Sequence, residues 1–276
     1  MTAEAGRRRC AVLGSPIAHS LSPALHRAAY AELGLDWSYD RFEVVEDGLA
    51  GFVAGCDETW RGLSLTMPLK AVALDLGEVD PLAAQVGAAN TLLFEADGSR
   101  RLHNTDVGGL VWALGRVGVT AVDRATLLGA GATARSTLVS LSRLGAREVT
   151  VLARTPARAV PLVALGDSLG MAVTVRSWTD PLPGADVVLN TAVTGAADAL
   201  AEAAAASAPV VFDAIYDPWP TRLAEAAAAA GCAVVNGLDL LVGQALLQIE
   251  LMTGRSVSAS TLEAAGRAAL ARSAPD

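Results

Sequence analysis

Short apolar segments alternate with helical segments between residues 124 and 237, and this alternation limits the folds that are open to the chain. The apolar segments have the length and the β-branched content of buried strands, and stretches of about 10–15 residues that favour helix separate most of them. Such a pattern predicts βαβ units and a parallel sheet covered by helices. The expected strands lie at 125–131, 148–154, 172–178, 185–192, 209–216 and 232–237.

The first hundred residues follow a similar pattern. Strands are expected at 10–14, 37–45, 61–66, 89–95 and 100–104, with a turn at 96–99 between the last two. Helices are expected at 22–34 and 106–118, and the chain from 237 onward is helical in composition. We therefore predict an α/β protein with two α/β domains built on parallel sheets, one formed by residues 1–106 with 239–276 and the other by 107–238. Ligands of such sheets bind outside the carboxyl ends of the strands, so the chemistry is expected in the cleft between the domains.

The composition argues against several classes of protein. A net charge of −8 supplies no basic surface for nucleic acid, and no apolar run approaches the roughly 18 residues that a membrane span requires. The basic cluster near the start precedes only about five apolar residues, too few for a signal peptide, so we expect a cytoplasmic protein that binds no membrane. The three cysteines and three histidines lack metal-ligand spacing, and no metal is expected. Monomer and homodimer both stay open.

The clearest local motif is LLGAGATAR at 127–135, which joins an expected strand to an expected helix. Gly129 permits a tight turn, and Gly131 lets the backbone approach a pyrophosphate at the helix N-terminus. Ala134 occupies the third position of the fingerprint, where alanine is accepted. The motif predicts a dinucleotide-binding Rossmann domain. The alternative is an ordinary turn with the same sequence and no ligand.

The end of the next expected strand indicates which dinucleotide is bound. Proteins that prefer NAD carry an acidic residue there for the ribose 2′-hydroxyl, whereas this chain has Arg154, Thr155 and Arg158. A guanidinium group pairs phosphate oxygens bidentately, so these residues favour the 2′-phosphate of NADP. The alternative is a solvated pair of arginines at a helix start.

Three further clusters place polar side chains beside expected strand ends. Ser22 precedes a proline and has the position of a helix N-cap, which leaves Ser20 unexplained; together the two hydroxyls could hold a small carboxylate. Asn90 in GAANT and Asp106 in HNTD could recognise hydroxyl groups and accept a proton. Taken singly, each of these residues has an alternative role in a turn or cap.

Eight motifs follow one another along the chain, in the order GSPIAHSLSPALH, LTMPLK, GAANT, NTD, GAGATAR, ART, DAIYDPWPT and GLDLLVGQA. In this order they resemble the motifs of the shikimate dehydrogenases along almost the whole length of the chain. That family has an N-terminal substrate-binding domain and an NADP-binding Rossmann domain, and it reduces 3-dehydroshikimate to shikimate with NADPH in the biosynthesis of aromatic amino acids.

The resemblance implies a role for each residue that matches a family motif. Lys70 and Asp106 correspond to the catalytic pair. The substrate carboxylate would be bound by Ser20, Ser22 and Tyr216, and the ring hydroxyls by Thr66, Asn90, Asp106 and Gln244. The pyrophosphate would lie against Gly129, Ala130, Gly131, Ala132 and Thr133, the 2′-phosphate against Arg154, Thr155 and Arg158, and the nicotinamide near Ala214 and Gly237.

The chain departs from the usual family pattern in three places. Ser64 and Leu65 stand where the family commonly has Asn-Val, and Ala153 replaces an asparagine before Arg154. Near the expected nicotinamide site, Asp239 and Leu240 replace a small residue and a methionine.

Lys70 is the single lysine among 21 basic side chains, the rest being arginine. Oxidation of a secondary alcohol by hydride loss requires removal of the hydroxyl proton, which a positioned general base performs. A lysine can act in this way, but an arginine cannot be deprotonated in a protein. The residues alone leave open whether Lys70 is such a base or an ordinary surface lysine, and the resemblance favours the base.

Two other functions fit the same motifs. One is a related dehydrogenase that acts on quinate or an amino analogue, with NAD or NADP. The other is a binding or sensor protein that keeps the NADP pocket without turnover, against which the complete set of Lys70, Asn90, Asp106 and Gln244 argues.

Overall fold

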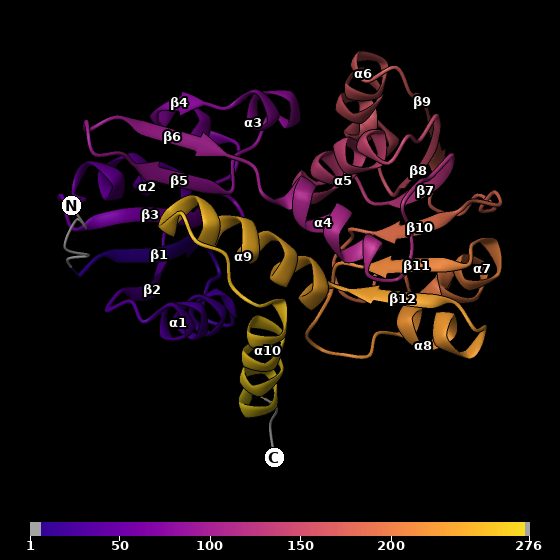
Figure 1. The fold of residues 1–276 in the computed structure, drawn as a ribbon. Helices are drawn as coiled ribbons and strands as arrows, with labels where there is room; N and C mark the ends of the chain where they lie inside the picture. The colour runs from indigo at the N-terminus through magenta and orange to yellow at the C-terminus, as the bar shows by residue number, and fades with distance from the viewer. Residues whose placement is uncertain (1–6, 274–276) are drawn as a thin grey trace. The chain divides into compact units, whose positions relative to one another are not determined.

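The computed structural model describes residues 7–273. The chain folds into two compact units, Met1–Thr105 with Leu241–Asp276 and Asp106–Leu240, which we call the first and the second unit (Figure 1). Each unit contains one six-stranded sheet. The units divide the chain after Thr105 and Leu240, whereas the sequence analysis divides it after 106 and 238.

The sheet of the second unit is parallel throughout, as the alternation of strands and helices predicts. Its strand order is β12-β11-β10-β7-β8-β9, which is the Rossmann order with β7 as its first strand. The order reverses between β7 and β10, so a ligand is expected at their carboxyl ends. The strands are β7 (Arg124–Leu128), β8 (Glu148–Ala153), β9 (Ala172–Ser177), β10 (Val187–Asn190), β11 (Val210–Asp213) and β12 (Ala233–Asn236).

Helices cover the two faces of this sheet in pairs, because right-handed crossovers place successive helices on one face until the strand order reverses. Helix α5 packs against α4 and α6, and α6 contacts β9, whereas α7 and α8 pack together and contact β11 (Figure 1). The helices are α4 (Asp106–Gly115), α5 (Ala132–Arg143), α6 (Val160–Ser168), α7 (Ala201–Ser207) and α8 (Arg222–Ala229), with 3₁₀ turns at Pro156–Ala159 and Asp198–Leu200.

The sheet of the first unit is mixed, so the prediction of a wholly parallel sheet was wrong here. Its order is β2-β1-β3-β5-β6-β4, and β5 runs antiparallel to both β3 and β6. A tight turn containing Gly98, at φ 84°, joins β5 to β6 as a hairpin, which needs no helical crossover. The strands are β1 (Arg9–Gly14), β2 (Ser38–Glu43), β3 (Trp60–Leu65), β4 (Glu78–Val79), β5 (Thr91–Phe94) and β6 (Arg100–His103).

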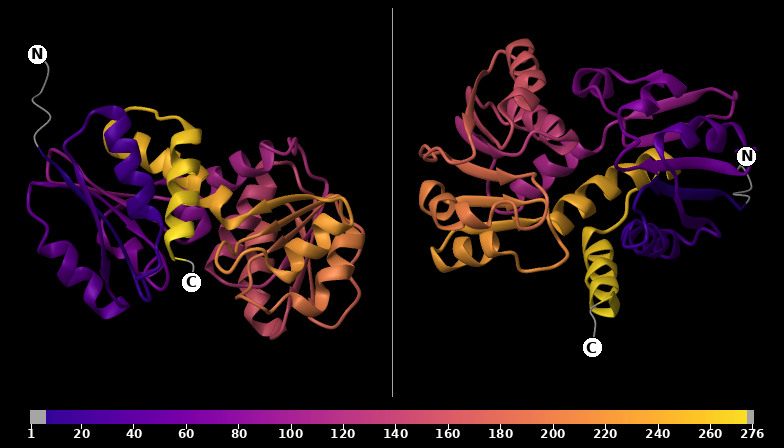
Figure 2. Two further views of the ribbon diagram at one scale, coloured as in Figure 1. Left: turned by 90° about the horizontal axis from the view of Figure 1, so that it is seen from below. Right: turned by 180° about the vertical axis from the view of Figure 1, so that it is seen from behind.

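Several helices of the first unit were not predicted, because they are short. The missed elements are α2 (Glu46–Ala54), the 3₁₀ turn Val72–Leu76, the strand β4 and α3 (Pro81–Val86). Helix α1 (Ser22–Leu33) was predicted, and α10 (Ala259–Ser273) packs against it (Figure 2). Helix α9 (Gly237–Thr253) begins in the second unit and continues into the first.

Strand β1 is buried on both faces, which explains its unbroken apolar sequence. Ala11 and Leu13 belong to one apolar cluster with residues of α2, while Cys10 and Val12 belong to another with residues of α1 and α9. Parallel strands enclosed on both sides read as continuous apolar runs. The polar residues that follow β1 and β3 therefore stand at the edge of a large core.

Candidate active site and dinucleotide site

The turn between β7 and α5 has the geometry that a dinucleotide requires. Gly129 has φ 106°, and a Cβ there would lie 2.9 Å from the Oγ1 of Thr191, just after β10. Gly131 is the N-cap of α5, no side chain caps that end, and a Cβ at this position would meet no atom within 4 Å. Ala134 is fully buried where the helix packs. An open helix N-terminus at the switch point fits a pyrophosphate.

Two arginines follow β8, which neighbours β7 in the sheet. Arg154, Thr155 and Arg158 are exposed, and within residues 7–273 neither arginine side chain makes a hydrogen bond or an ion pair. No carboxylate occupies the end of the strand, where Ala153 is buried. The chain therefore offers two guanidinium groups where a 2′-phosphate would lie, which fits NADP better than NAD.

The carboxyl ends of β10 and β11 are joined by a polar pair that the sequence analysis did not single out. The Nδ2 of Asn190 donates to the Oδ1 of Asp213 over 2.9 Å, and both residues are buried. Asp213 also accepts from the backbone N–H of Ile215 at 3.2 Å and from the Thr221 hydroxyl at 2.6 Å. The carboxylate thereby shapes the loop that carries Ala214 and Tyr216.

The phenol of Tyr216, predicted to contact the substrate, is half-buried in this loop of the second unit. Burial raises the pKa of Tyr216 above its usual value, and the nearby Asp217 adds to the shift. Its hydroxyl is therefore protonated at neutral pH and can donate a hydrogen bond to a carboxylate.

Gly237 lies directly against the same loop. A Cβ on Gly237 would collide with the carbonyl oxygen of Ala214, so the two predicted nicotinamide neighbours are in contact and the position requires glycine. The departure at Asp239 has a structural explanation: Asp239 and Asn236 form a reciprocal cap at the start of α9, with hydrogen bonds of 2.9 and 3.0 Å.

In the first unit, the loops after β1 and β3 lie side by side. The backbone N–H of Thr66 donates to the carbonyl of Leu13, and that of Ser15 donates to the carbonyl of Met67, both at 2.9 Å. A Cβ on Gly14 would collide with the Thr66 side chain. Only glycine permits this approach, which sets the loop leading to α1 beside the loop that contains Lys70.

The two serines of the first loop meet at the start of α1. Helix α1 begins at Ser22 with Leu21 as its N-cap residue, so the interpretation of Ser22 as the N-cap was wrong by one position. The Oγ of Ser20 accepts a hydrogen bond of 3.4 Å from the backbone N–H of Ser22. Ser20 is half-buried and Ser22 is buried, so Ser20 has the more accessible hydroxyl.

Lys70 and Asn90 stand on neighbouring segments. The N–H of Ala89 donates to the carbonyl of Lys70, and the N–H of Leu65 donates to the carbonyl of Asn90, each over 2.8 Å. These two bonds fix both ends of the 66–70 loop to the residues that precede β5. Lys70 and Thr66 are half-buried, as expected for side chains that line a site.

Asn90 and Gln244 are in direct contact. The Nδ2 of Asn90 donates to the Oε1 of Gln244 over 2.9 Å, and the Oδ1 of Asn90 accepts from the backbone N–H of Thr105 over 2.8 Å. Asp106 follows Thr105 directly, so their Cα atoms are about 3.8 Å apart. Asp106 is buried at the first residue of α4.

Behind Asn90 lies a buried polar network that sequence reasoning missed. Its centre is Gln248, one turn beyond Gln244 on α9. A pair of glutamines four residues apart in the apolar middle of α9 was the available signal. The network comprises His26, Tyr39, Ser64, Thr91 and Gln248, all at most 4% exposed.

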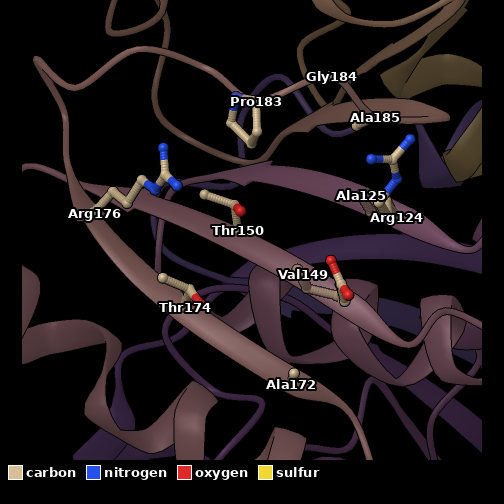
Figure 3. Close-up of a pocket in the computed structure, with 11 residues that line it drawn as sticks. Arg124, Ala125, Val149, Thr150, Ala172, Thr174, Arg176, Pro183, Gly184 and Ala185 are labelled. Carbon is tan, nitrogen blue, oxygen red and sulfur yellow. The ribbon is translucent and has the colours of Figure 1, made fainter.

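Two surface pockets lie away from these residues. One, of about 220 Å³, opens over the amino-terminal parts of β7 and β8 and along β9, with Arg124, Thr150 and Arg176 in its lining (Figure 3). The other, of about 610 Å³, lies in the first unit near Trp60 and Arg100. Neither contains a predicted site residue, and the first lies at the opposite end of the sheet from Gly129.

The described residues contain neither a metal-binding cluster nor a membrane-spanning helix. Between residues 7 and 273, no three or more His, Cys, Asp or Glu side chains are grouped so as to hold a metal ion. Over the same range, every helix is too short or too polar to span a bilayer.

Comparisons with known proteins agree with this arrangement. Residues 12–92 match the family described as the shikimate dehydrogenase substrate binding domain. A curated protein of Methanothrix thermoacetophila named shikimate dehydrogenase (NADP(+)) is 39% identical over 269 residues, covering 95% of this chain and 97% of its own.

Solved structures extend the likeness to the whole fold. A shikimate 5-dehydrogenase from Mycobacterium fortuitum matches with a TM-score of 0.87 and 42% identity, over 94% of this chain and 97% of that one. A shikimate 5-dehydrogenase from Thermus thermophilus, solved in complex with NADP(H) and shikimate, matches with a TM-score of 0.81 and 34% identity, over 95% of this chain and 99% of that one. The resemblance inferred from the ordered motifs is thereby confirmed, and the chain belongs to the shikimate dehydrogenase family.

Proposed function

We propose that this chain catalyses the reversible NADPH-dependent reduction of 3-dehydroshikimate to shikimate in aromatic amino acid biosynthesis. The observation that carries the proposal is the backbone hydrogen bond from Ala89 to Lys70, which sets Lys70 beside Asn90 and its partner Gln244. The Lys70 amine, the amides of Asn90 and Gln244 and the Thr66 hydroxyl together suit a polyhydroxylated substrate with a reacting carbonyl.

Most of the substrate contacts in this proposal come from the first unit, and Tyr216 and Asp106 of the second unit add to them. Ser20 and Ser22 bind its carboxylate, because both stand at the start of α1, where backbone N–H groups also favour an anion. Tyr216 donates a further hydrogen bond to that carboxylate. The ring hydroxyls are bound by Thr66, Asn90, Asp106 and Gln244.

Lys70 and Asp106 act as the acid–base pair. In the direction of reduction, the Lys70 ammonium donates a proton to the carbonyl oxygen as the carbon receives hydride, so that no free alkoxide forms. In the reverse direction the neutral amine removes the hydroxyl proton. Asp106 is placed for this task by Thr105, whose backbone N–H is fixed on Asn90.

The second unit holds the dinucleotide. The segment Gly129–Thr133 at the start of α5 binds the pyrophosphate, and Arg154, Thr155 and Arg158 bind the 2′-phosphate. Ala214 and Gly237, which are in contact, flank the nicotinamide. When bound, NADPH supplies the hydride.

The test is the initial rate of nicotinamide reduction with shikimate, measured with NADP and NAD in parallel and repeated with quinate. The proposal expects turnover of shikimate with NADP and much slower turnover with NAD. Faster turnover of quinate would show that the proposed substrate is wrong, and faster turnover with NAD would show that the proposed cofactor is wrong. NADP binding without any turnover would overturn the enzymatic proposal and leave a sensor. A cytoplasmic location and a monomeric or homodimeric state stay predictions.

A further inference from the structure

The side-chain amide of Gln244 is held in one orientation, with its oxygen toward Asn90. The backbone N–H of Thr105 can only donate, so the atom of Asn90 that it contacts at 2.8 Å is the carbonyl oxygen. The other end of the Asn90 amide is then NH₂, and it donates to Gln244 over 2.9 Å. The Gln244 atom that accepts this hydrogen bond is therefore its side-chain oxygen, Oε1. Within residues 7–273 its Nε2 has no hydrogen-bond partner, so it presents a donor outward.

The Thr91 hydroxyl also helps to fix the orientation of the Asn90 amide. Gln248 in turn fixes the direction of the Thr91 O–H bond. The Nε2 of Gln248 donates to the Oγ1 of Thr91 over 2.9 Å, so the Thr91 proton points elsewhere, to the Oδ1 of Asn90 at 3.0 Å. The same Nε2 lies 3.1 Å from the backbone carbonyl of Asn90 and ties α9 to the start of β5. Gln248 thus holds the backbone of Asn90 directly and the side chain of Asn90 through Thr91.

Gln248 is itself oriented from the core. The Tyr39 hydroxyl donates to Ser64 over 2.5 Å, which directs the Ser64 proton to the Oε1 of Gln248 at 2.9 Å. His26 lies 3.3 Å from the same oxygen. Burial lowers the pKa of His26 to about 3, so its ring is neutral at physiological pH and donates through Nε2. Ser64, which departs from the family pattern, therefore points into the core network.

We propose that Gln248 is a positioning residue, which acts through Thr91 and Asn90 to hold the Gln244 amide with its NH₂ group toward the substrate. The inference rests on the proposed function for the identity of the ligand. Its consequence is that the substrate group at Gln244 is a hydrogen-bond acceptor, and that substrate affinity depends on three residues that do not touch substrate: Gln248, Thr91 and Ser64.

The decisive variant is Thr91→Val, which keeps the size and shape of the side chain and removes the relaying hydroxyl. We expect the KM for shikimate to rise about tenfold, with a smaller change in kcat and an unchanged KM for NADP. Thr91→Ser, which restores the hydroxyl, should recover the wild-type KM. Gln248→Met should act in the same direction, but it also leaves the buried Ser64 O–H and His26 Nε2–H without an acceptor and destabilises the fold.

A double-mutant cycle separates positioning from a general structural effect. In a Gln244→Ala background, Thr91→Val should change the KM for shikimate by less than about twofold, because the group that it orients is gone. A full tenfold effect in that background would overturn the proposal, since Thr91 would then act independently of Gln244.

The proposal can be judged even where the enzymatic function fails. If the wild-type chain does not turn over shikimate, the proposed function falls, and the relay is tested by the side-chain amide signals of Asn90 and Gln244 in ¹⁵N NMR of the ligand-free protein. Thr91→Val should move the Gln244 signals and Thr91→Ser should leave them in place. Gln244 signals that do not respond to Thr91→Val would overturn the relay.

Discussion

Asn190 and Asp213 are joined by a buried hydrogen bond of 2.9 Å between the ends of the adjacent strands β10 and β11. Each strand is otherwise apolar and fully buried, so the pair is the point where the sheet interior meets the loops of the predicted dinucleotide site. The carboxylate also holds the Thr221 hydroxyl and the Ile215 N–H.

Asp213→Ala should lower the free energy of unfolding by about 3 kcal/mol. It leaves the Asn190 amide, the Ile215 N–H and the Thr221 hydroxyl without their acceptor. It should also raise the KM for NADP, since the loop bearing Ala214 loses its anchor. Urea denaturation and steady-state kinetics measure the two effects. Thr221→Val removes one of the three bonds together with the N-cap of α8, where the Thr221 hydroxyl accepts from the Ala224 N–H, and should cost about 2 kcal/mol. Equal losses for the two variants would show that Asp213 does not organise the loop.

Lys70→Arg should abolish turnover although it retains the positive charge, because a guanidinium group cannot exchange a proton at neutral pH. We expect kcat to fall by about 10²- to 10⁴-fold. NADPH binding, followed by fluorescence, should stay near the wild-type value, because every predicted dinucleotide contact lies in the second unit. Substantial activity in Lys70→Arg would rule out Lys70 as the proton donor.

Arg154→Gln and Arg158→Gln should each raise the KM for NADP by roughly 10- to 100-fold, because each removes a charge-assisted hydrogen bond to phosphate. The KM for NAD, which lacks that phosphate, should not change. Arg143→Gln is the matched control: this arginine is also exposed in the second unit, but at the far end of α5. A parallel rise in both KM values would contradict 2′-phosphate recognition.

The neutral, buried His26 should make the protein less stable in acid. Its pKa is about 3 in the folded chain and about 6.5 when unfolded, so the unfolded chain binds the extra proton between these values. The stability that His26 confers is therefore complete above pH 6.5 and is lost as the pH falls toward 3. Between pH 7.5 and pH 5 we expect a loss of about 2 kcal/mol from this residue.

The measurement is urea denaturation at both pH values for the wild type and for His26→Gln, which cannot titrate. Tyr39 stacks on the His26 ring at 4.0 Å and Tyr30 packs edge-on against it, and burial raises the pKa of both phenols, so neither ionises in this range. Titrations common to the two proteins cancel in the comparison. The same pH dependence in both would exclude His26 as its source.

Local sequence was sufficient for features that depend on neighbouring residues alone. The fingerprint Gly129–Gly131–Ala134 has the predicted turn, open helix end and close packing, because backbone freedom at a glycine is a local property. The strand–helix alternation after residue 124 predicted the parallel sheet for the same reason, since a helical crossover joins parallel strands. The arginines after β8 lie at the strand end where the spacing had suggested them.

Contacts between distant residues were not readable in the chain. The pairing of β5 with β3, the partnership of Asn190 with Asp213, and the network around Gln248 join residues from 23 to 222 positions apart. Each depends on which strands and helices become neighbours after folding. The sequence by itself determined the fold family and the residue types of the site. Only the tertiary structure decided the orientation of the Gln244 amide, because hydrogen bonds between buried groups become directional constraints once folding has excluded water from them.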